Sequence, residues 1–498
     1  MRTPNNQITM DLPLGAVCKD VVVIGNGPGG IALSHLLSGH WPYYTGAAHP
    51  TDEDLTARFV SEPARSLVQQ DLRFLSQGLE GRCNNPVSLL FDALFHPCAD
   101  MGLDVPPLIS WRYHPEKRID HVVLGRGPPG GSWQTMDGNV LTISLSKWME
   151  LPGLDFRSYG GSIGPPAGRD SRASVAALAR YYSDYVRRRG IEKNFHCGTV
   201  VTSVSLLQEV MPSCKRDPET GVDIEQENPL WVVQGVQLGG DEGAPDIPFC
   251  YVSPHVVLAT GNYDRPNKLN VPGDSLPFVL YSLTDMERMV AQGKLTEESD
   301  PVLVVGAGLS AADAVIAARF HGLPVIHAFR RSTSDPGFVF RQLPENMYPE
   351  YHKVHQMMVD GGTNYPGYRA LPERKIMEIR EDNKVRLIGM GTKSSTCYVV
   401  RVSVIVALIG AQPDLSFLPS GGTHLGVHKE LPVQSRTNPV KVDPYTHQCV
   451  AAPGLYAIGS LAGDNFVRFV HGGALAITSH LHKERRQSET CTDSESQN

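Results

Sequence analysis

Two copies of a glycine-rich motif, each placed directly after a run of four apolar residues, constrain the fold of this chain most. The runs at 21–24 and 302–305 are typical of short, buried strands, and the motifs at 25–30 and 306–311 lead from them into helical patterns. A strand, a glycine-rich turn and a helix in this order open a βαβ unit of a nucleotide-binding fold. The chain therefore begins two such folds, about 280 residues apart.

The first copy is a complete GxGxxG motif formed by Gly25, Gly27 and Gly30. The first glycine permits a tight turn, the second lets the backbone approach a pyrophosphate, and the third allows the helix to pack closely on the strand. The N-terminus of the helix then offers N–H groups and a partial positive charge to the phosphates. We therefore predict that these three glycines bind a dinucleotide.

The second copy keeps Gly306 and Gly308, has alanine as its third small residue, and places Ser310 at the start of the helix. About 20 residues beyond it, Arg330 and Arg331 follow the next apolar segment. An NAD-binding fold has an acid at this place, which holds the ribose 2′-hydroxyl, whereas arginine suits a 2′-phosphate by charge and bidentate geometry. We therefore predict that these residues bind NADPH; a solvated arginine pair on a loop is the alternative.

Two nucleotide-binding folds on one chain are typical of a flavoprotein that binds FAD through the first fold and NADPH through the second. We predict an α/β protein with two Rossmann-type domains, in which the NADPH domain is inserted into the FAD domain. The predicted parts, in chain order, are 15–285 for the first FAD part with an insert at 41–120, 299–415 for the NADPH domain, 416–483 for the second FAD part, and 484–498 for a disordered tail.

Composition and patterning exclude several other classes of protein. The 498 residues include 45 Lys and Arg against 52 Asp and Glu, and this mild acidity argues against a nucleic-acid partner. The sequence shows neither an apolar run long enough for a transmembrane segment nor a secretory signal, so we expect a cytoplasmic location. The nine cysteines include no CxxC pair, which removes the dithiol disulfide reductases, and no ligand spacing indicates a metal site.

Further segments resemble those of two-nucleotide flavoproteins. Residues 257–261 (VLATG) resemble the strand at which such proteins link their domains. Residues 454–475 resemble their C-terminal flavin segment, whose helix directs its N-terminus at the flavin. The residues that this resemblance adds to the predicted cofactor sites are Gly261, Gly459, Asp464 and Gly472.

Residues 130–133 (GGSW) are similar to the GGxW element of flavin-dependent monooxygenases, and the resemblance implies that Gly131 and Trp133 contact FAD. The asparagine that flavin-containing monooxygenases place near the flavin falls at Ser144, the one flavin-side candidate for catalysis. The strand before GGxW ends in Gly125, where related enzymes carry a glutamate that binds the FAD ribose. This departure predicts weaker flavin binding.

Longer stretches resemble the oxidative stress-induced growth inhibitor family. They span nearly the whole chain, at 23–28, 75–82, 86–94, 121–126, 306–315, 324–331, 348–358 and 461–475. The resemblance implies an NADPH-linked flavin monooxygenase that restrains proliferation or acts in differentiation, cell death or late cell division. It further implies regulatory protein partners and a cytoskeletal or division-site association within the cytoplasm.

The leading hypothesis is a single-component monooxygenase. NADPH would reduce FAD, and oxygen would then form a C4a-peroxyflavin that oxidises a nitrogen, a sulfur or a carbonyl group of a small-molecule or protein substrate. The second hypothesis is a catalytically weak, redox-sensing flavoprotein that binds nucleotides and acts through a partner. A plain NADPH oxidase or reductase is the third.

Overall fold

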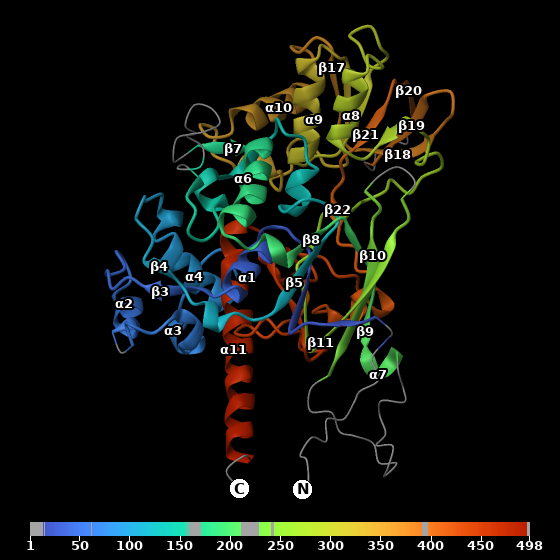
Figure 1. The fold of residues 1–498 in the computed structure, drawn as a ribbon. Coiled ribbons are helices and arrows are strands. Elements are labelled where there is room, and N and C mark those ends of the chain that lie inside the picture. The colour runs from blue at the N-terminus through green and yellow to red at the C-terminus, as the bar shows by residue number, and fades with distance from the viewer. Residues whose placement is uncertain are drawn as a thin grey trace. The chain divides into compact units, whose positions relative to one another are not determined.

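The structure, a computed structural model, divides the chain into two compact units (Figure 1). The first unit comprises residues up to 134, 141–262 and the segment from 413 onward, and the second comprises 135–140 and 263–412. The second unit is therefore an insertion into the first, as the sequence predicts. The residues that the structure describes are 13, 15–60, 62–156, 159, 171–210, 229–240, 244–390 and 397–495, with side chains to 487.

A five-stranded parallel sheet forms the centre of the first unit. Apart from the edge strand at Phe195–Cys197, which is largely exposed, its strands are short, mainly apolar runs buried on both faces, because helices and a second sheet cover them. In spatial order the strands are β23 (Leu455–Ala457), β12 (His255–Leu258), β2 (Val21–Ile24), β5 (His121–Gly125) and β8 (Phe195–Cys197). The helices α1 (Pro28–Leu37) and α11 (Val470–Glu495) pack against each other beside it.

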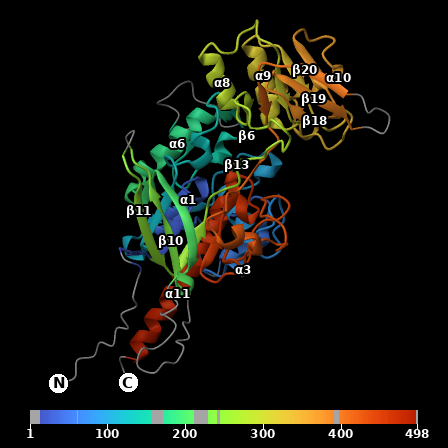
Figure 2. The ribbon, with the colours of Figure 1, turned by 90° about the vertical axis from the view of Figure 1, so that its right-hand side faces the viewer.

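A four-stranded sheet contacts the parallel one in the first unit. Figure 2 shows two of its strands, β10 and β11. Strands β9, β10 and β11 pair antiparallel, and β1 pairs parallel with β11. The four strands are β1 (Val17–Cys18), β9 (Thr199–Leu206), β10 (Trp231–Gln237) and β11 (Ile247–Ser253). Other elements of this unit are β6 (Leu141–Leu145), β7 (Arg172–Ser174), α6 (Val175–Arg188) and α7 (Leu207–Val210).

The segment predicted as an insert at 41–120 forms a small subdomain of the first unit. Its two strands pair with each other and stay outside the parallel sheet, so β5 takes the place next to β2. One of its helices, α4, packs on α11 and so fixes the subdomain to the core. The elements are β3 (His40–Tyr44), α2 (Glu53–Phe59), α3 (Leu72–Leu75), α4 (Pro86–Phe95) and β4 (Ile109–Tyr113).

The second unit repeats the parallel architecture. Its sheet runs β14 (Val279–Leu280), β21 (Ile405–Ala407), β15 (Val302–Val305), β16 (Val325–Ala328) and β17 (Tyr368–Leu371), all parallel. The other elements are β13 (Arg265–Pro266), α8 (Leu283–Ala291), α9 (Leu309–Phe320), α10 (Pro349–Asp360), β18 (Arg374–Ile379), β19 (Lys384–Gly389), β20 (Cys397–Arg401) and β22 (Ala411–Gln412).

The boundary between the units differs from the predicted one. The sequence placed 263–285 in the first FAD part, but β14 pairs with β21 and therefore completes the second sheet. The predicted boundary came too late in the chain because a two-residue strand carries almost no periodic signal.

The predicted disordered tail is corrected as well. The helix α11 continues to Glu495, and only 496–498 lie outside the described residues (Figure 1). Extending a helix that the core has already nucleated costs less than starting one. Its exposed part also has partners, since Glu484 lies 3.6 Å from His480 and Arg485 donates to the backbone carbonyl of Arg118 at 3.1 Å.

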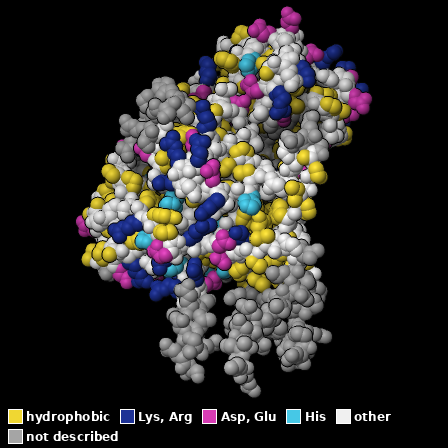
Figure 3. All heavy atoms as spheres, in the orientation of Figure 1, with side chains coloured by type: hydrophobic (Ala, Val, Ile, Leu, Met, Phe, Trp, Pro, Cys, Tyr) yellow, Lys and Arg dark blue, Asp and Glu magenta, His cyan; other side chains and the backbone are white. Residues whose placement is uncertain are grey.

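Acidic and basic side chains are interspersed on the face shown in Figure 3. Within the described ranges, no helix combines the length and the apolar character that a membrane crossing requires.

We predict that His121 makes the first unit sensitive to acid. This side chain is buried in β5, where Nδ1–H donates to the carbonyl oxygen of Ile119 and Nε2 accepts from the Ser34 hydroxyl, each at 2.8 Å. Burial lowers the pKa of His121 from 6.5 to about 4. Between these values the unfolded chain binds a proton that the folded chain does not, so the free energy of unfolding falls as the pH falls.

Urea unfolding at about pH 7 and about pH 5 measures this loss. H121Q should reduce the difference between the two pH values, whereas H428Q, at an exposed position, should leave it unchanged. Equal pH dependence in H121Q and the unaltered protein would contradict the assignment.

Candidate functional site

The first glycine-rich loop joins β2 to α1. Gly25 has a φ of +114°, and a Cβ atom on it would lie 2.3 Å from the carbonyl oxygen of Ala259. A Cβ atom on Gly30 would lie 2.1 Å from the carbonyl oxygen of Gly25, so this position permits the close approach of helix and strand. Apart from its own chain neighbours, no described residue has an atom within 4 Å of such a Cβ on Gly27. The loop therefore leaves room for a ligand phosphate at the N-terminus of α1.

The GGxW segment packs directly on this loop. The N–H group of Gly130 donates to the carbonyl oxygen of Asn26 at 2.8 Å, and a Cβ atom on Gly131 would lie 3.0 Å from the Cα atom of Gly27. Trp133 follows in a short 3-10 helix and is half-buried. The structure thus brings together the two motifs that the sequence assigned to one cofactor.

Gly261 and Gly459 follow the carboxyl ends of two neighbouring strands, β12 and β23. Their φ angles are +77° and +71°, and a Cβ atom on Gly261 would lie 4.0 Å from the Ser460 hydroxyl. The Oγ1 atom of Thr260 is buried and has no hydrogen-bond partner in the part of the chain that is described. Ligands of open α/β sheets bind at this edge, so an unpaired hydroxyl here fits a polar ligand group.

Asp464 does not lie at this edge as a free carboxylate. It is 2% exposed and accepts hydrogen bonds from Cys83 Sγ at 2.8 Å, Asn85 Nδ2 at 2.8 Å and Ser88 Oγ at 2.9 Å. Burial raises the pKa of Asp464 above its ordinary value. Its oxygens thus already accept hydrogen bonds from the segment that begins α4, and a role of Asp464 toward the cofactor stays a prediction.

Gly472 and Ser144 lie elsewhere in the first unit. A Cβ atom on Gly472 would lie 2.2 Å from the Cα atom of Ser88, so glycine is required where α11 crosses α4. This packing accounts for the glycine without a flavin, and its role toward FAD stays a prediction. Ser144 lies half-buried in β6, and its catalytic role likewise stays a prediction.

The position of the missing ribose acid is filled by another side chain. A Cβ atom on Gly125 would lie 2.1 Å from Asn26 Nδ2, which donates to the carbonyl oxygen of Gly127 at 2.7 Å. An acidic side chain therefore has no room at this position while Asn26 keeps its place. The first loop fits a pyrophosphate but has no carboxylate for the ribose at the end of β5.

The second loop has the same geometry as the first. Gly306 has a φ of +138°, and a Cβ atom on it would lie 2.3 Å from the carbonyl oxygen of Leu408. Around a Cβ on Gly308, the described part of the chain places no atom within 4 Å apart from the immediate neighbours in sequence, and Ser310 is exposed in the first turn of α9. Ala311 is buried, which explains why a small residue follows at the third position of the motif. This loop, too, leaves room for a phosphate.

The two arginines after β16 differ in their surroundings. Arg331 lies 3.1 Å from the carboxylate of Asp335, and a Cβ atom on Gly337 would lie 2.7 Å from its Nη1. Arg330 is exposed and forms no ion pair within the described residues. Of these two arginines, Arg330 is therefore the one without an ion pair to a described residue, while Arg331 stabilises the turn that follows.

The cysteines form no disulfide among the described residues. Seven are free thiols, namely Cys18, Cys83, Cys98, Cys197, Cys250, Cys397 and Cys449. Burial, together with the Asp464 carboxylate, raises the pKa of Cys83, and burial raises that of Cys449 to about 12. Neither buried thiol forms a thiolate at neutral pH. A search of the same residues finds no group of three ligands that could hold a metal ion.

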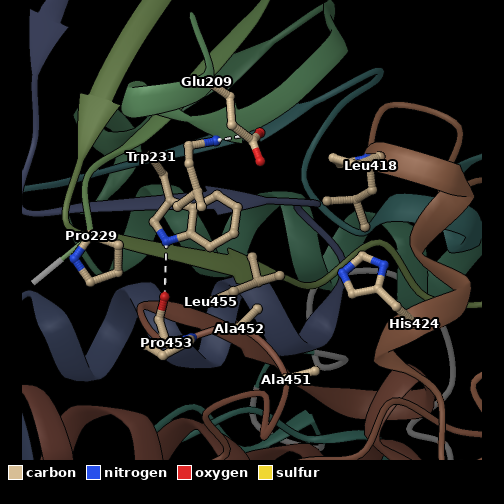
Figure 4. Close-up of a pocket in the computed structure, with 11 residues that line it drawn as sticks. Glu209, Pro229, Trp231, Leu418, His424, Ala451, Ala452, Pro453 and Leu455 are labelled. Carbon is tan, nitrogen blue, oxygen red and sulfur yellow. Dashed lines mark hydrogen bonds between the residues drawn. The ribbon is translucent and has the colours of Figure 1, made fainter. Parts of the chain in front are cut away.

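A small pocket of about 200 Å³ lies in the first unit, and its lining residues do not belong to the first loop (Figure 4). Its wall includes Trp231 of β10, whose Nε1 donates to the carbonyl oxygen of Pro453 at 3.1 Å. Glu209 and His424 are its polar neighbours, and most other lining residues are apolar. None of the cofactor-binding or catalytic residues that the sequence predicts lines this pocket.

Two residues that contact the loops were not predicted. Asn26 lies inside the first motif, where its place between two glycines was a visible signal. His327 donates through Nε2 to the carbonyl oxygen of Gly306 at 2.7 Å. His327 is a polar residue within an otherwise apolar strand. Because a buried polar group requires a hydrogen-bond partner, this position could have indicated a specific contact.

Comparisons with known proteins agree with this architecture. A family model described as pyridine nucleotide-disulphide oxidoreductase matches residues 250–459. Bacillithiol disulfide reductase from Bacillus cereus superposes with a TM-score of 0.56 at 15% identity, covering 94% of this chain and 100% of that one. Ornithine hydroxylase from Pseudomonas aeruginosa superposes with a TM-score of 0.52 at 10% identity, covering 94% and 99%. Both share the fold of this chain.

A sequence relative is far more similar. The mouse protein named oxidative stress-induced growth inhibitor 1 is 45% identical over 470 residues, which are 93% of this chain and 95% of the relative. The family model and the two loops together imply FAD and NADPH as cofactors. On this similarity, the chain belongs to the oxidative stress-induced growth inhibitor family.

Proposed function

We propose that this chain is an NADPH-dependent flavin monooxygenase that acts in the control of cell growth. The observation that carries the proposal is the contact of the GGxW segment with the first loop, through the hydrogen bond from Gly130 to Asn26. The second loop, with Arg330 unpaired beside it, supports NADPH as the reductant. The growth-related role rests on the name of the mouse relative.

The residues of the chain would bind and orient the two cofactors. Backbone N–H groups at Gly27 and at the start of α1 would hold the FAD pyrophosphate, and those at Gly308 and Ser310 would hold that of NADPH. Arg330 would pair with the 2′-phosphate of NADPH. When bound, FAD supplies the electron transfer from NADPH to O2 through which a substrate nitrogen, sulfur or carbonyl group is oxygenated.

A dithiol reductase is a weaker explanation of the same fold. Such an enzyme needs two cysteines close enough to form a disulfide, and the sequence contains no CxxC pair. Cys83 and Cys449, the two buried thiols, have raised pKa values and so are poor nucleophiles.

Asn26 favours a second candidate function. Because its side chain fills the space beside Gly125, the ribose of FAD would lack its usual carboxylate partner. A chain that holds FAD weakly would bind NADPH and turn over slowly. The second candidate is therefore a nucleotide-sensing regulatory protein that acts through a partner.

The proposed activity predicts three linked measurements on the purified full-length chain. It should show the visible absorption of bound flavin, consume NADPH and O2 in equal amounts with a substrate amine or thioether, and release little hydrogen peroxide. Stoichiometric peroxide, detected by adding catalase, would instead indicate an NADPH oxidase. NADPH binding without bound flavin or NADPH consumption would favour the regulatory candidate over the monooxygenase.

Arg330 and Arg331 should contribute unequally to coenzyme choice. R330A should weaken NADPH binding by about 10- to 100-fold, the effect of losing a charge-assisted hydrogen bond, and should leave NADH binding unchanged. R331A should have a much smaller effect, because Arg331 pairs with Asp335. Titration of each variant with both coenzymes measures the difference, and equal losses in the two variants would contradict the assignment.

Restoring a ribose acid should require two substitutions. G125E alone should destabilise the first unit, because its Cβ would lie 2.1 Å from Asn26 Nδ2. The double variant N26A/G125E removes that clash and should bind FAD about tenfold more tightly than the control N26A, through a carboxylate–ribose hydrogen bond. FAD dissociation measured by fluorescence is the readout. No gain over N26A would show that Gly125 does not face the ribose.

A further inference from the structure

His327 is a fully buried histidine in the strand that follows the second loop. It lies in β16, has 0% exposure and is the one strongly polar side chain of that strand. Burying an imidazole without partners is costly, so its hydrogen bonds show what it does. It has two, and one of them goes to the nucleotide loop.

The hydrogen bonds fix which nitrogen of the ring carries the proton. The carbonyl oxygen of Gly306, 2.7 Å from Nε2, can only accept, so Nε2 must be protonated. Nδ1 is then an acceptor, and the hydroxyl of Tyr368, 3.0 Å away, donates to it. Tyr368 therefore selects the tautomer of His327 that can hold Gly306.

Sheet register brings the two side chains together. Val325 pairs with Tyr368 in β17, and His327 lies two residues further along β16, so both side chains are on the same face of the sheet. His327 itself pairs with Val304, two residues before Gly306. The pair thus lies directly beneath the turn of the second loop.

Among the described residues, the first loop has no histidine at the equivalent place. Val304 pairs with His327 at the register position where Val23 pairs with Val123 in the first unit. Val123 is apolar, and its Cγ1 would lie 3.7 Å from a Cβ atom on Gly30. The histidine is therefore not a requirement of the fold and distinguishes the second loop from the first.

Holding the carbonyl group of Gly306 also orients the next N–H group. In a planar trans peptide the C=O and N–H bonds point in opposite directions. The Gly306 oxygen points to His327 in the sheet, so the N–H of Ala307 points away from the sheet. This N–H has no hydrogen-bond partner among the described residues. It is therefore free to donate to a ligand phosphate.

We propose that Tyr368 and His327 are positioning residues that hold the Gly306–Ala307 peptide with its N–H group directed at the pyrophosphate of NADPH, an inference that rests on the proposed function. Neither side chain touches the coenzyme. Tyr368 acts through His327, and His327 acts through the backbone of the loop.

Burial keeps this pair neutral. It lowers the pKa of His327 to about 4 and raises that of Tyr368 above its ordinary value. The Nε2–H tautomer is thus present throughout the neutral range, and the orientation of the peptide does not depend on pH there.

The test compares two probes in titrations of the full-length protein. NADPH contains the pyrophosphate, whereas adenosine 2′-monophosphate contains only the 2′-phosphate that Arg330 would bind. Y368F and H327L should each weaken NADPH binding about three- to tenfold, as expected for one hydrogen bond, and leave adenosine 2′-monophosphate binding unchanged. H327Q, whose amide can donate toward Gly306, should recover part of the loss seen in H327L.

H321Q is the matched control, because His321 lies in the same unit but bonds Glu287 at 2.9 Å, away from the loop. It should bind both probes as the unaltered protein does. Hydrogen exchange of the Ala307 amide with NADPH bound provides a second readout. The protection that NADPH gives this amide should be smaller in Y368F, while the amides of β15 stay protected.

Three results would overturn the inference. Unchanged NADPH affinity in both Y368F and H327L would show that the pair does not support the loop. Equal weakening of both probes would show a general loss of structure rather than an effect on the pyrophosphate. Absence of NADPH binding by the unaltered protein would refute the NADPH site of the proposed function, and this inference with it.

Discussion

The buried carboxylate of Asp464 holds the first unit together. It accepts hydrogen bonds from Cys83, Asn85 and Ser88, residues 376 to 381 positions away in the sequence. Nearby, the buried guanidinium of Arg468 pairs with the Asp92 carboxylate of α4 at 3.2 Å. Removing one partner of a buried charge costs about 3–5 kcal/mol, so these contacts fix α4 against the C-terminal segment.

This constraint explains the arrangement around the first loop. Because α4 is held in place, α11 can pack between it and α1, and the absence of a side chain at Gly472 lets the two helices approach. The loop at Gly25 then lies between the carboxyl end of β2 and the backbone of Ala259. The insert at 41–120 is thus a structural support of the FAD half rather than an appended segment.

The sequence allowed the parts of the fold with strong local signals to be predicted. The apolar runs at 21–24 and 302–305 are the strands β2 and β15, and both glycine motifs form the predicted turns. The features that the sequence does not reveal depend on contacts between distant residues. The local pattern around Asp464 resembles a cofactor segment, but it gives no sign that donors from the start of α4 bond this carboxylate. The short β14 joins the second sheet only because β21 lies beside it.

The absence of an acid at Gly125 is best understood together with Asn26. The two positions are 99 residues apart in the sequence, so reading either alone gives a missing ligand or an unremarkable polar residue. In the structure the Asn26 side chain occupies the space where a side chain at 125 would begin and bonds Gly127. Glycine at 125 and asparagine at 26 therefore depend on each other. A larger residue at 125 would clash with the Asn26 side chain, and a smaller residue at 26 would leave an unfilled space. The loop keeps room for a pyrophosphate but has no carboxylate at the end of β5, so the predicted FAD site would depend on the phosphate loop, the GGxW segment and the edge at Thr260.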